Sequence, residues 1–155
     1  MKKRPSARLL LVDRQRRILL FHFSHHDDAL AGQSYWATPG GGVEAGESWE
    51  QAACRELREE TGIVREDPGV CIAERTFPMR LPDGSEVLAD ERFYAIEVSD
   101  HEIDFAGWSD NERRVIDQSE WWTGEQLRCS EETIYPDNIA QLLSDFISEK
   151  RITAI

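Results

Sequence analysis

Cysteine is scarce in this sequence, and long hydrophobic runs are absent. The three cysteines, Cys54, Cys71 and Cys129, are odd in number and widely spaced, and no CxxC motif occurs. This usage argues against a disulfide framework or a cysteine zinc site, and it predicts a reducing, cytoplasmic environment. The first apolar stretch ends at Val12 and is too short for a signal peptide. No run approaches the roughly 18 residues of a membrane span, so we expect no membrane partner.

Positive charge is also in short supply. The 155-residue chain carries 18 Lys and Arg against 30 Asp and Glu, a formal net charge of -12 at pH 7. Nucleic acid polymers are bound mainly through Lys and Arg at their phosphates, so this balance argues against such a partner. A small phosphorylated ligand is compatible with it if a divalent cation locally reverses the sign of the charge.

The basic residues that are present gather near the start of the chain. They are Lys2, Lys3, Arg4, Arg8, Arg14, Arg16 and Arg17. Such a cluster is the one feature that would give the 5′ end of an RNA a basic track. We favour the simpler interpretation, which is a solvated N-terminus.

The composition and the order of apolar segments indicate the fold class. With 40% hydrophobic and 31% charged residues the chain is typical of a globular protein, and its length predicts one domain over residues 1–155. Strands are expected at 9–12, 18–23, 35–38, 70–77, 87–98 and 115–122, and further helices from Thr123 with Gln126 and over Pro136–Lys150. This alternation predicts an α/β fold, with a mixed β-sheet between helices.

The strongest helical pattern runs from Glu47 to Thr61. Ser48 and Gln51 have the spacing of a capping box, and Gly62 stands where a helix commonly ends. Pro39-Gly40-Gly41-Gly42 precedes this helix, and we expect it to form a turn with unusual backbone angles.

Three carboxylates lie close together on this helix. Glu56, Glu59 and Glu60 are at positions i, i+3 and i+4, so they share one face and repel one another. Arg55 and Arg58 compensate only part of that charge, whereas Mg²⁺ prefers such oxygen ligands together with substrate phosphates. A glycine run before the helix lets a ligand approach the backbone closely. The triplet by itself is more often a solvated face, but the complete pattern favours metal-assisted attack on a phosphate.

The complete pattern has fixed spacing. Gly41 is followed after five residues by Glu47, after seven more by Arg55-Glu56-Leu57, and then by Glu59-Glu60 and Gly62-Ile63. From Gly41 to Ile63 this resembles the signature box of the Nudix hydrolases at every fixed position. The resemblance implies an α/β/α sandwich and hydrolysis, with Mg²⁺ or Mn²⁺, of a nucleoside diphosphate linked to another group X.

The resemblance also implies roles for single residues. Glu56, Glu59 and Glu60 correspond to metal-binding carboxylates, and one of the last two orients or deprotonates the attacking water. Arg55 corresponds to the arginine that holds these carboxylates and pairs back toward Glu47. Gly40, Gly41 and Gly42 would form the loop that approaches the substrate.

Many family members use one more acid from outside the box. The candidates are Glu91, Glu97, Glu102, Asp110 and Glu112. The tract Asp110-Asn111-Glu112-Arg113-Arg114 resembles a loop of small bacterial members in which such a glutamate occurs. We therefore favour Glu112 as a further metal ligand, with a solvated loop as the alternative.

A histidine-rich loop and the tryptophans are further candidates. His22, His25 and His26 lie near Asp27 and Asp28, which suggests a second metal site, although we favour an ordinary loop without a metal; a further alternative is that the loop borders the cleft and contacts the substrate. Trp36 is expected in packing, with stacking on a base as the alternative. Trp121 and Trp122 would point to opposite faces of a strand, and Cys54 is expected to be a small buried hydrophobe.

The leading interpretation is a pyrophosphohydrolase that acts on free nucleoside triphosphates. ADP-sugars and dinucleoside polyphosphates are the alternative substrates; Pro78, fifteen residues after Ile63, is a weak pointer to ADP-sugars. A non-catalytic nucleotide-binding module is the alternative of another class, although the box keeps all its carboxylates. A homodimer is compatible with the sequence.

Overall fold

The chain folds around a mixed sheet in a computed structural model that describes residues 1–153. The strands are β1 (Lys3–Val12), β2 (Ile18–Ser24), β3 (Ser34–Ala37), β4 (Gly40–Gly42), β5 (Cys71–Arg80), β6 (Glu86–Glu97), β7 (Ile116–Trp122) and β8 (Ile134–Tyr135). The helices are α1 (Trp49–Thr61), the 3₁₀ turn η1 (Asp100–Glu102), α2 (Asp110–Val115), α3 (Gly124–Cys129) and α4 (Ile139–Thr153).

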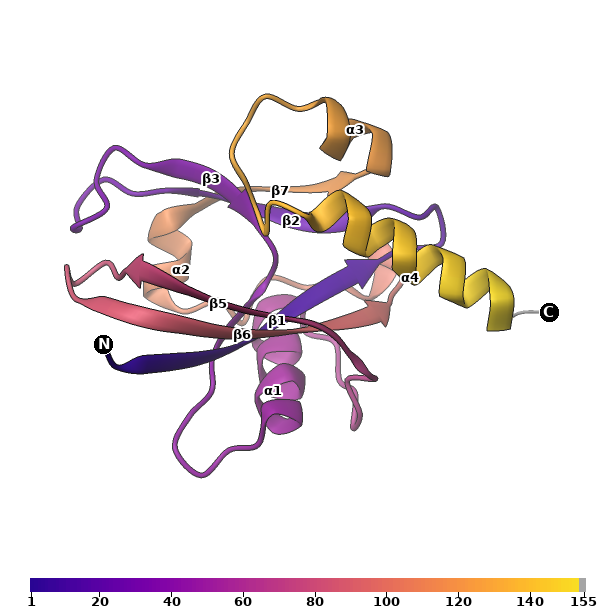
Figure 1. The fold of residues 1–155 in the computed structure, drawn as a ribbon, viewed down its shortest axis with the longest axis horizontal. Coiled ribbons are helices and arrows are strands. Elements are labelled where there is room, and N and C mark those ends of the chain that lie inside the picture. Colours follow the sequence, from indigo (N-terminus) through magenta and orange to yellow (C-terminus); the bar gives the residue numbers. More distant parts are fainter. Residues whose placement is uncertain (154–155) are drawn as a thin grey trace.

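The strands follow the order β5-β6-β1-β2-β3-β8, with β4 paired to β1 and β7 paired to β2. β1 runs parallel to β6, and β3 runs parallel to β8, while the other pairs are antiparallel. α1 and α4 lie on opposite faces of this sheet (Figure 1). The prediction of a mixed sheet between helices is therefore confirmed.

The sheet splits beside β1. β1 is in register with β2 only at Val12 and Ile18, and towards its start β4 takes the place of β2. Ser6 pairs there with Gly42, and Arg8 pairs with Gly40. The half of the sheet with β2, β3 and β7 thus separates from the half with β1, β5 and β6, and β4 lies at the separation.

Two cores form because side chains alternate along a strand. Ala7, Leu9 and Leu11 of β1 pack on the α1 side, whereas Leu10 and Val12 pack on the α4 side. The same alternation places Trp121 against the first core and Trp122 in the second, as predicted.

The ends of α1 follow the predicted signals. The Ser48 hydroxyl accepts a hydrogen bond from the Gln51 amide, and the Gln51 side chain accepts one from the Ser48 amide. Gly62 ends the helix at a φ of 75° and donates to the Arg58 carbonyl. The helix itself begins at Trp49, two residues after the predicted start, because Ser48 is the cap.

Three sequence-based expectations were wrong. Gly40–Gly42 is a strand paired with β1 and not a turn, because a Cβ at Gly40 would collide with the Ala7 carbonyl while glycine allows that close pairing. The first strand begins at Lys3, so Lys3, Arg4 and Arg8 belong to the sheet and not to a solvated terminus. Residues 110–115 form helix α2, whose capping box supports it although it buries no side chain.

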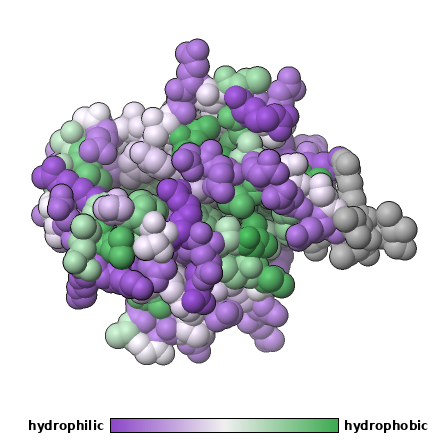
Figure 2. All heavy atoms as spheres, viewed as in Figure 1, coloured by the Kyte–Doolittle hydropathy of each residue, from purple (hydrophilic) through white to green (hydrophobic). Residues whose placement is uncertain are grey.

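The surface is mainly polar. In Figure 2 hydrophilic residues cover most of the face shown, and hydrophobic residues reach the surface between them in separate groups. Within the described residues no helix combines the length and the apolar character that crossing a membrane requires.

Candidate active site

Strand β4 and helix α1 meet at a glycine that leaves room for a carboxylate. A Cβ at Gly41 would lie 2.5 Å from Oε1 of Glu56. Glu56 is only 7% exposed, so its carboxylate packs directly on the strand. Burial raises the pKa of Glu56, while the charge of Arg55 opposes that change. Gly41 is thus required by the position of Glu56.

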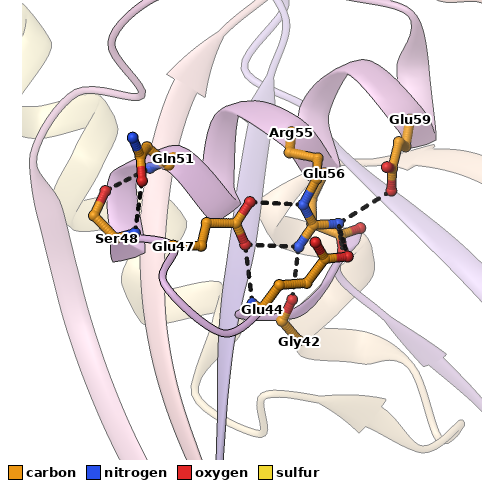
Figure 3. A network of polar contacts seen from close by, with 8 residues as sticks. All are labelled: Gly42, Glu44, Glu47, Ser48, Gln51, Arg55, Glu56 and Glu59. Atoms are coloured by element: carbon orange, nitrogen blue, oxygen red, sulfur yellow. Dashed lines mark hydrogen bonds and ion pairs between the residues drawn. The ribbon is translucent and has the colours of Figure 1, made fainter.

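Arg55 ties the loop before α1 to the helix, as Figure 3 shows. Its Nε donates to Oε2 of Glu47 at 2.8 Å, and its Nη2 donates to Oε1 of Glu47 at 2.9 Å and to the Gly42 carbonyl at 2.8 Å. These hydrogen bonds lower the pKa of the Glu47 carboxyl. Glu47 is therefore held as an organising residue, in keeping with the sequence-based expectation.

The remaining nitrogen of Arg55 bridges two of the clustered carboxylates. Nη1 donates to Oε1 of Glu56 at 2.9 Å and to Oε2 of Glu59 at 3.2 Å. The Glu59 side chain is 44% exposed. One guanidinium thus offsets the repulsion that the spacing of the carboxylates creates.

Glu60 meets Glu112, which comes from α2. Glu60 is 3% exposed, and its Oε2 is buried without a hydrogen-bond partner. Burial, followed by the hydrogen bond and charge of Glu112, raises the pKa of Glu60 to about 10. Burial also acts to raise the pKa of Glu112, but hydrogen bonds with Glu60 and Ser109 outweigh it and leave that pKa lowered. The two carboxyls therefore lie close enough for each to change the pKa of the other.

The capping box of α2 positions Glu112. Its Oε1 accepts from the Ser109 amide at 2.8 Å, and its own amide donates to the Ser109 hydroxyl. The same side chain therefore caps the short helix and faces Glu60.

A cleft of about 530 Å³ connects these groups with the far half of the sheet. Its lining has an acidic end with Glu60 and Glu112, arginines on β1 and β5, and aromatic rings. The rings belong to Phe23, Tyr35, Phe77, Phe93 and Tyr135. The volume falls within the range of small-molecule sites, which is about 300–1,000 Å³.

One wall of the cleft is held by the predicted histidine-rich loop. Buried His25 contacts Oδ2 of Asp28 at 2.8 Å and the Tyr35 hydroxyl at 2.9 Å. The Tyr35 ring stacks on Phe23 with centroids 5.4 Å apart, and Tyr135 meets it edge-on at 5.5 Å. The prediction that this loop borders the cleft is confirmed.

Two loops meet over one end of the cleft. The Ala29 amide, from the β2–β3 loop, donates to the Pro82 carbonyl of the β5–β6 turn at 2.9 Å. Leu30 is buried and lines the cleft beneath this contact, together with Pro82.

The other candidate acids divide into two groups. Glu91 lines the cleft, where its Oε2 accepts from Nε of Arg8 at 2.8 Å. Glu102 instead pairs with Arg65 at 3.0 Å, and Asp110 is exposed at the start of α2. Glu97 ends β6 beside Val12, at the opposite end of β1 from β4. Of these candidates, Glu112 and Glu91 reach the cleft.

Two further candidates are not part of the cleft lining. Trp36 is 3% exposed and packs in the α4-side core against Trp122, which rules out stacking on a base. Cys54 is half-buried, and burial raises the pKa of its thiol, as expected of a packing residue.

Sequence reasoning assigned the arginines of β1 to a solvated terminus, and it missed the tyrosines of the wall. Arg4 and Arg8 alternate with Ala7 and Leu9, a period of two that would have identified a strand with one polar face. Tyr135 follows a polar stretch and carries no periodic signal. Its place in the wall depends on β8 pairing with β3, which is a long-range contact.

The sequence profile of the NUDIX domain matches residues 2–146. This chain belongs to the Nudix hydrolase family. The predicted box, Gly41 to Ile63, is the segment in which β4, Arg55 and the clustered glutamates assemble.

Two Nudix structures share the fold with this chain at low sequence identity. A MutT protein from Methanosarcina mazei Go1 has a TM-score of 0.64 and 23% identity, over 96% of each chain. A MutT NUDIX hydrolase from Burkholderia pseudomallei has a TM-score of 0.60 and 23% identity, over 90% of this chain and 96% of the other. These likenesses show the Nudix fold.

A curated relative is similar over a shorter segment. The RNA pyrophosphohydrolase of Edwardsiella ictaluri is 35% identical over 74 residues, which is 48% of this chain. The matched segment spans 38% of the length of that relative.

Nudix hydrolases generally use divalent metals, and the donor set here fits one. Hard cations prefer carboxylate oxygens, and the orphaned Oε2 of Glu60 offers a buried donor atom. Within residues 1–153 no three His, Cys, Asp or Glu side chains already converge as an ion-binding group. Nη1 of Arg55 donates to one oxygen of Glu56 and one of Glu59, which leaves the other oxygen of each carboxylate for a cation.

Proposed function

We propose that this chain is a Mg²⁺- or Mn²⁺-dependent pyrophosphohydrolase that cleaves a nucleoside diphosphate linked to another group, with free nucleoside triphosphates as substrates. One observation carries the proposal. Glu60 and Glu112 meet at the end of a nucleotide-sized cleft, beside Glu56 and Glu59 held by Arg55. Four carboxylates in so small a space are suited to a divalent cation and a pyrophosphate.

Each residue of the site has a part in the proposed reaction. Glu56, Glu59, Glu60 and Glu112 would hold the metal, which supplies charge neutralisation and a bound water of lowered pKa. Glu59 or Glu60 orients the water that attacks phosphorus and takes its proton. Arg55 keeps the helix carboxylates in place through Glu47 and the Gly42 carbonyl. Backbone groups of Gly40, Gly41 and Gly42 border the substrate.

The shape of the cleft favours a free nucleotide. The loop contact between Ala29 and Pro82 closes one end, and the exposed Tyr135 offers a ring to a base. The net charge of -12 opposes a long polyanion outside the cleft.

A second candidate substrate is the 5′ end of an RNA. It is favoured by the name of the relative from Edwardsiella ictaluri and by the arginines of β1 in the cleft. ADP-sugars, to which the cleft-lining Pro78 is a weak pointer, and dinucleoside polyphosphates are further alternatives. A nucleotide-binding module without activity is the alternative of another class.

The test is a substrate panel with purified protein. Nucleoside triphosphates, ADP-ribose, dinucleoside polyphosphates and a 5′-triphosphorylated oligonucleotide are incubated with Mg²⁺ or Mn²⁺ and with EDTA, and the products are separated by anion exchange. We expect metal-dependent cleavage of nucleoside triphosphates. Preference for the oligonucleotide would favour the RNA alternative, and nucleotide binding without any cleavage would favour a binding module.

A further inference from the structure

The glycine strand β4 has a different neighbour on each face. A Cβ at Gly41 would point at Glu56, whereas a Cβ at Gly42 would lie 3.6 Å from Nη2 of Arg4. Adjacent residues of a strand face opposite sides, so Arg4 and Glu56 flank the same short strand. A group bound at the α1 carboxylates is therefore separated from the Arg4 guanidinium only by unbranched backbone.

Arg4 shares its sheet face with Arg75. Arg4 is in register with Ala89 of β6, which is in register with Phe77 of β5. Arg75 stands two residues before Phe77, and its guanidinium lies over the Phe77 ring with Cζ 4.4 Å from the ring centroid. Two strand spacings, about 10 Å, separate the rows of β1 and β5. Both arginines line the cleft.

Neither of these two arginines has an ion pair of the kind that Arg8 has. Arg8, also in the cleft, pairs with Glu91. Arg4 donates to the Ser6 hydroxyl at 2.9 Å, and Arg75 stacks on Phe77. In the part of the chain that the structure describes, no ion pair joins either of the two to a carboxylate, although the sequence holds 30 acidic residues. Glu91, which is in register with Arg75, is already engaged by Arg8. Two guanidinium groups without an ion pair on one cleft floor favour an anionic ligand.

Burial makes the lack of a partner costly for Arg4. Burial, together with the charge of Arg8, lowers the pKa of Arg4, although the charges of Glu91 and Glu56 oppose that change. A guanidinium presents a planar fork of N–H donors that matches phosphate oxygens. Of these donors, one is used by Ser6, so the rest remain available to a ligand.

We propose that Arg4 and Arg75 form a second phosphate subsite, which binds the part of a triphosphate chain that the α1 carboxylates and their metal do not hold. The inference rests on the proposed function and narrows its substrate class. A nucleotide sugar has no third phosphate to place there, so the subsite makes the enzyme select triphosphates over ADP-ribose. A free nucleotide and an RNA 5′ end share this chemistry.

Kinetics of three variants test the subsite. Arg4→Gln and Arg75→Gln are compared with Lys3→Gln, which removes the same charge from an exposed neighbour on β1. We expect kcat/KM for a nucleoside triphosphate to fall at least about tenfold in the first two, since hydrogen bonds between charged groups are strong. For ADP-ribose the change is smaller, and Lys3→Gln behaves as the wild type. Equal losses for both substrates, or none, would overturn the proposal.

Binding without metal separates this inference from the proposed activity. Inorganic tripolyphosphate is titrated into each protein in EDTA and followed by calorimetry. Weaker binding in Arg4→Gln than in Lys3→Gln, with partial recovery in Arg4→Lys, supports the subsite even if the wild type cleaves nothing. Equal binding in all variants contradicts it even if the wild type is active. A 5′-triphosphorylated oligonucleotide in the kinetic series decides whether the triphosphate comes from RNA.

Discussion

Gly41 shows how much of the site depends on a missing side chain. A methyl group there would meet the Glu56 carboxylate at 2.5 Å and push it from the strand. We expect Gly41→Ala to lower the free energy of unfolding by about 1–3 kcal/mol, the usual effect of overpacking, and to reduce kcat. Urea unfolding and steady-state kinetics measure the two effects. Gly42→Ala is the stability control, because its Cβ finds ordinary contact at 3.6 Å.

A substitution at Glu59 is expected to affect kcat much more than the free energy of unfolding, unlike Gly41→Ala, which affects both. Its side chain is 44% exposed, so Glu59→Gln should change the free energy of unfolding by less than about 0.5 kcal/mol. If Glu59 holds the metal or the attacking water, kcat falls at least about 100-fold.

The exposed Glu50, on the same helix, provides the matched control for this change. Glu50→Gln should leave kcat within about twofold of the wild type, as a surface substitution away from the cleft does. Full activity in Glu59→Gln would remove Glu59 from the site.

Residues near one another in sequence were predicted well, and residues that meet across the sheet were not. The shared face of Glu56, Glu59 and Glu60 follows from helical periodicity alone. The position of Arg4 depends on the ten residues of β1 pairing with β6, in which Arg4 is in register with the distant Ala89. No local pattern contains that pairing, so the basic residues were interpreted as solvated.

At the scale of elements, the ion pair between Arg55 and Glu47 ties α1 to the loop that follows the glycine strand. Arg55 lowers the pKa of Glu47 below its ordinary 4.5. Since the unfolded chain binds the proton more tightly, the pair stabilises the fold above about pH 4.5, and this contribution is lost as the pH falls through the lowered pKa.

A pH series of urea unfolding tests this linkage. We expect the wild type to exceed Glu47→Gln in stability at pH 7, and the difference to shrink as the pH falls below the ordinary pKa of 4.5. The exposed Glu50→Gln, at the same helix end, is the control and should show no such trend. A difference that stays constant with pH would contradict the assignment.

The elements were predictable where caps or apolar periods mark them. The capping boxes at Ser48 and Thr123 located α1 and α3 in advance. Helix α2 has the same device at Ser109, but it buries no residue and lacks an apolar period, so its tract was expected to be a loop. Strand β4 was missed because three glycines have no strand propensity. They form a strand only because they pair with β1.

At the scale of the whole molecule, the sheet separates two cores of unequal importance for catalysis. Leu57 of α1 and Leu143 of α4 are both fully buried, one on each side. Truncation of either to Ala should cost about 2–5 kcal/mol. Because the two sites share no partners, the costs should add in the double variant.

Activity distinguishes the two truncations. Measured at a temperature at which both variants remain folded by circular dichroism, Leu57→Ala should lower kcat, since Leu57 adjoins Glu56 and seats α1 on the sheet. Leu143→Ala should retain kcat, because α4 contributes no residue to the cleft lining. Equal losses in both variants would show that the site depends on the whole sheet and not on α1.

The strand of three glycines also separates the residues proposed for catalysis from those proposed for substrate selection. On its α1 side stand Glu56 and Arg55, and on its other side stands Arg4, with nothing but backbone between them. Substitutions on β1, β5 or the β2–β3 loop would therefore change the substrate specificity without changing the catalytic residues on α1. Because only the backbone of β4 lies between the two sets, the same hydrolytic reaction can be adapted to new substrates through residues that do not contact α1.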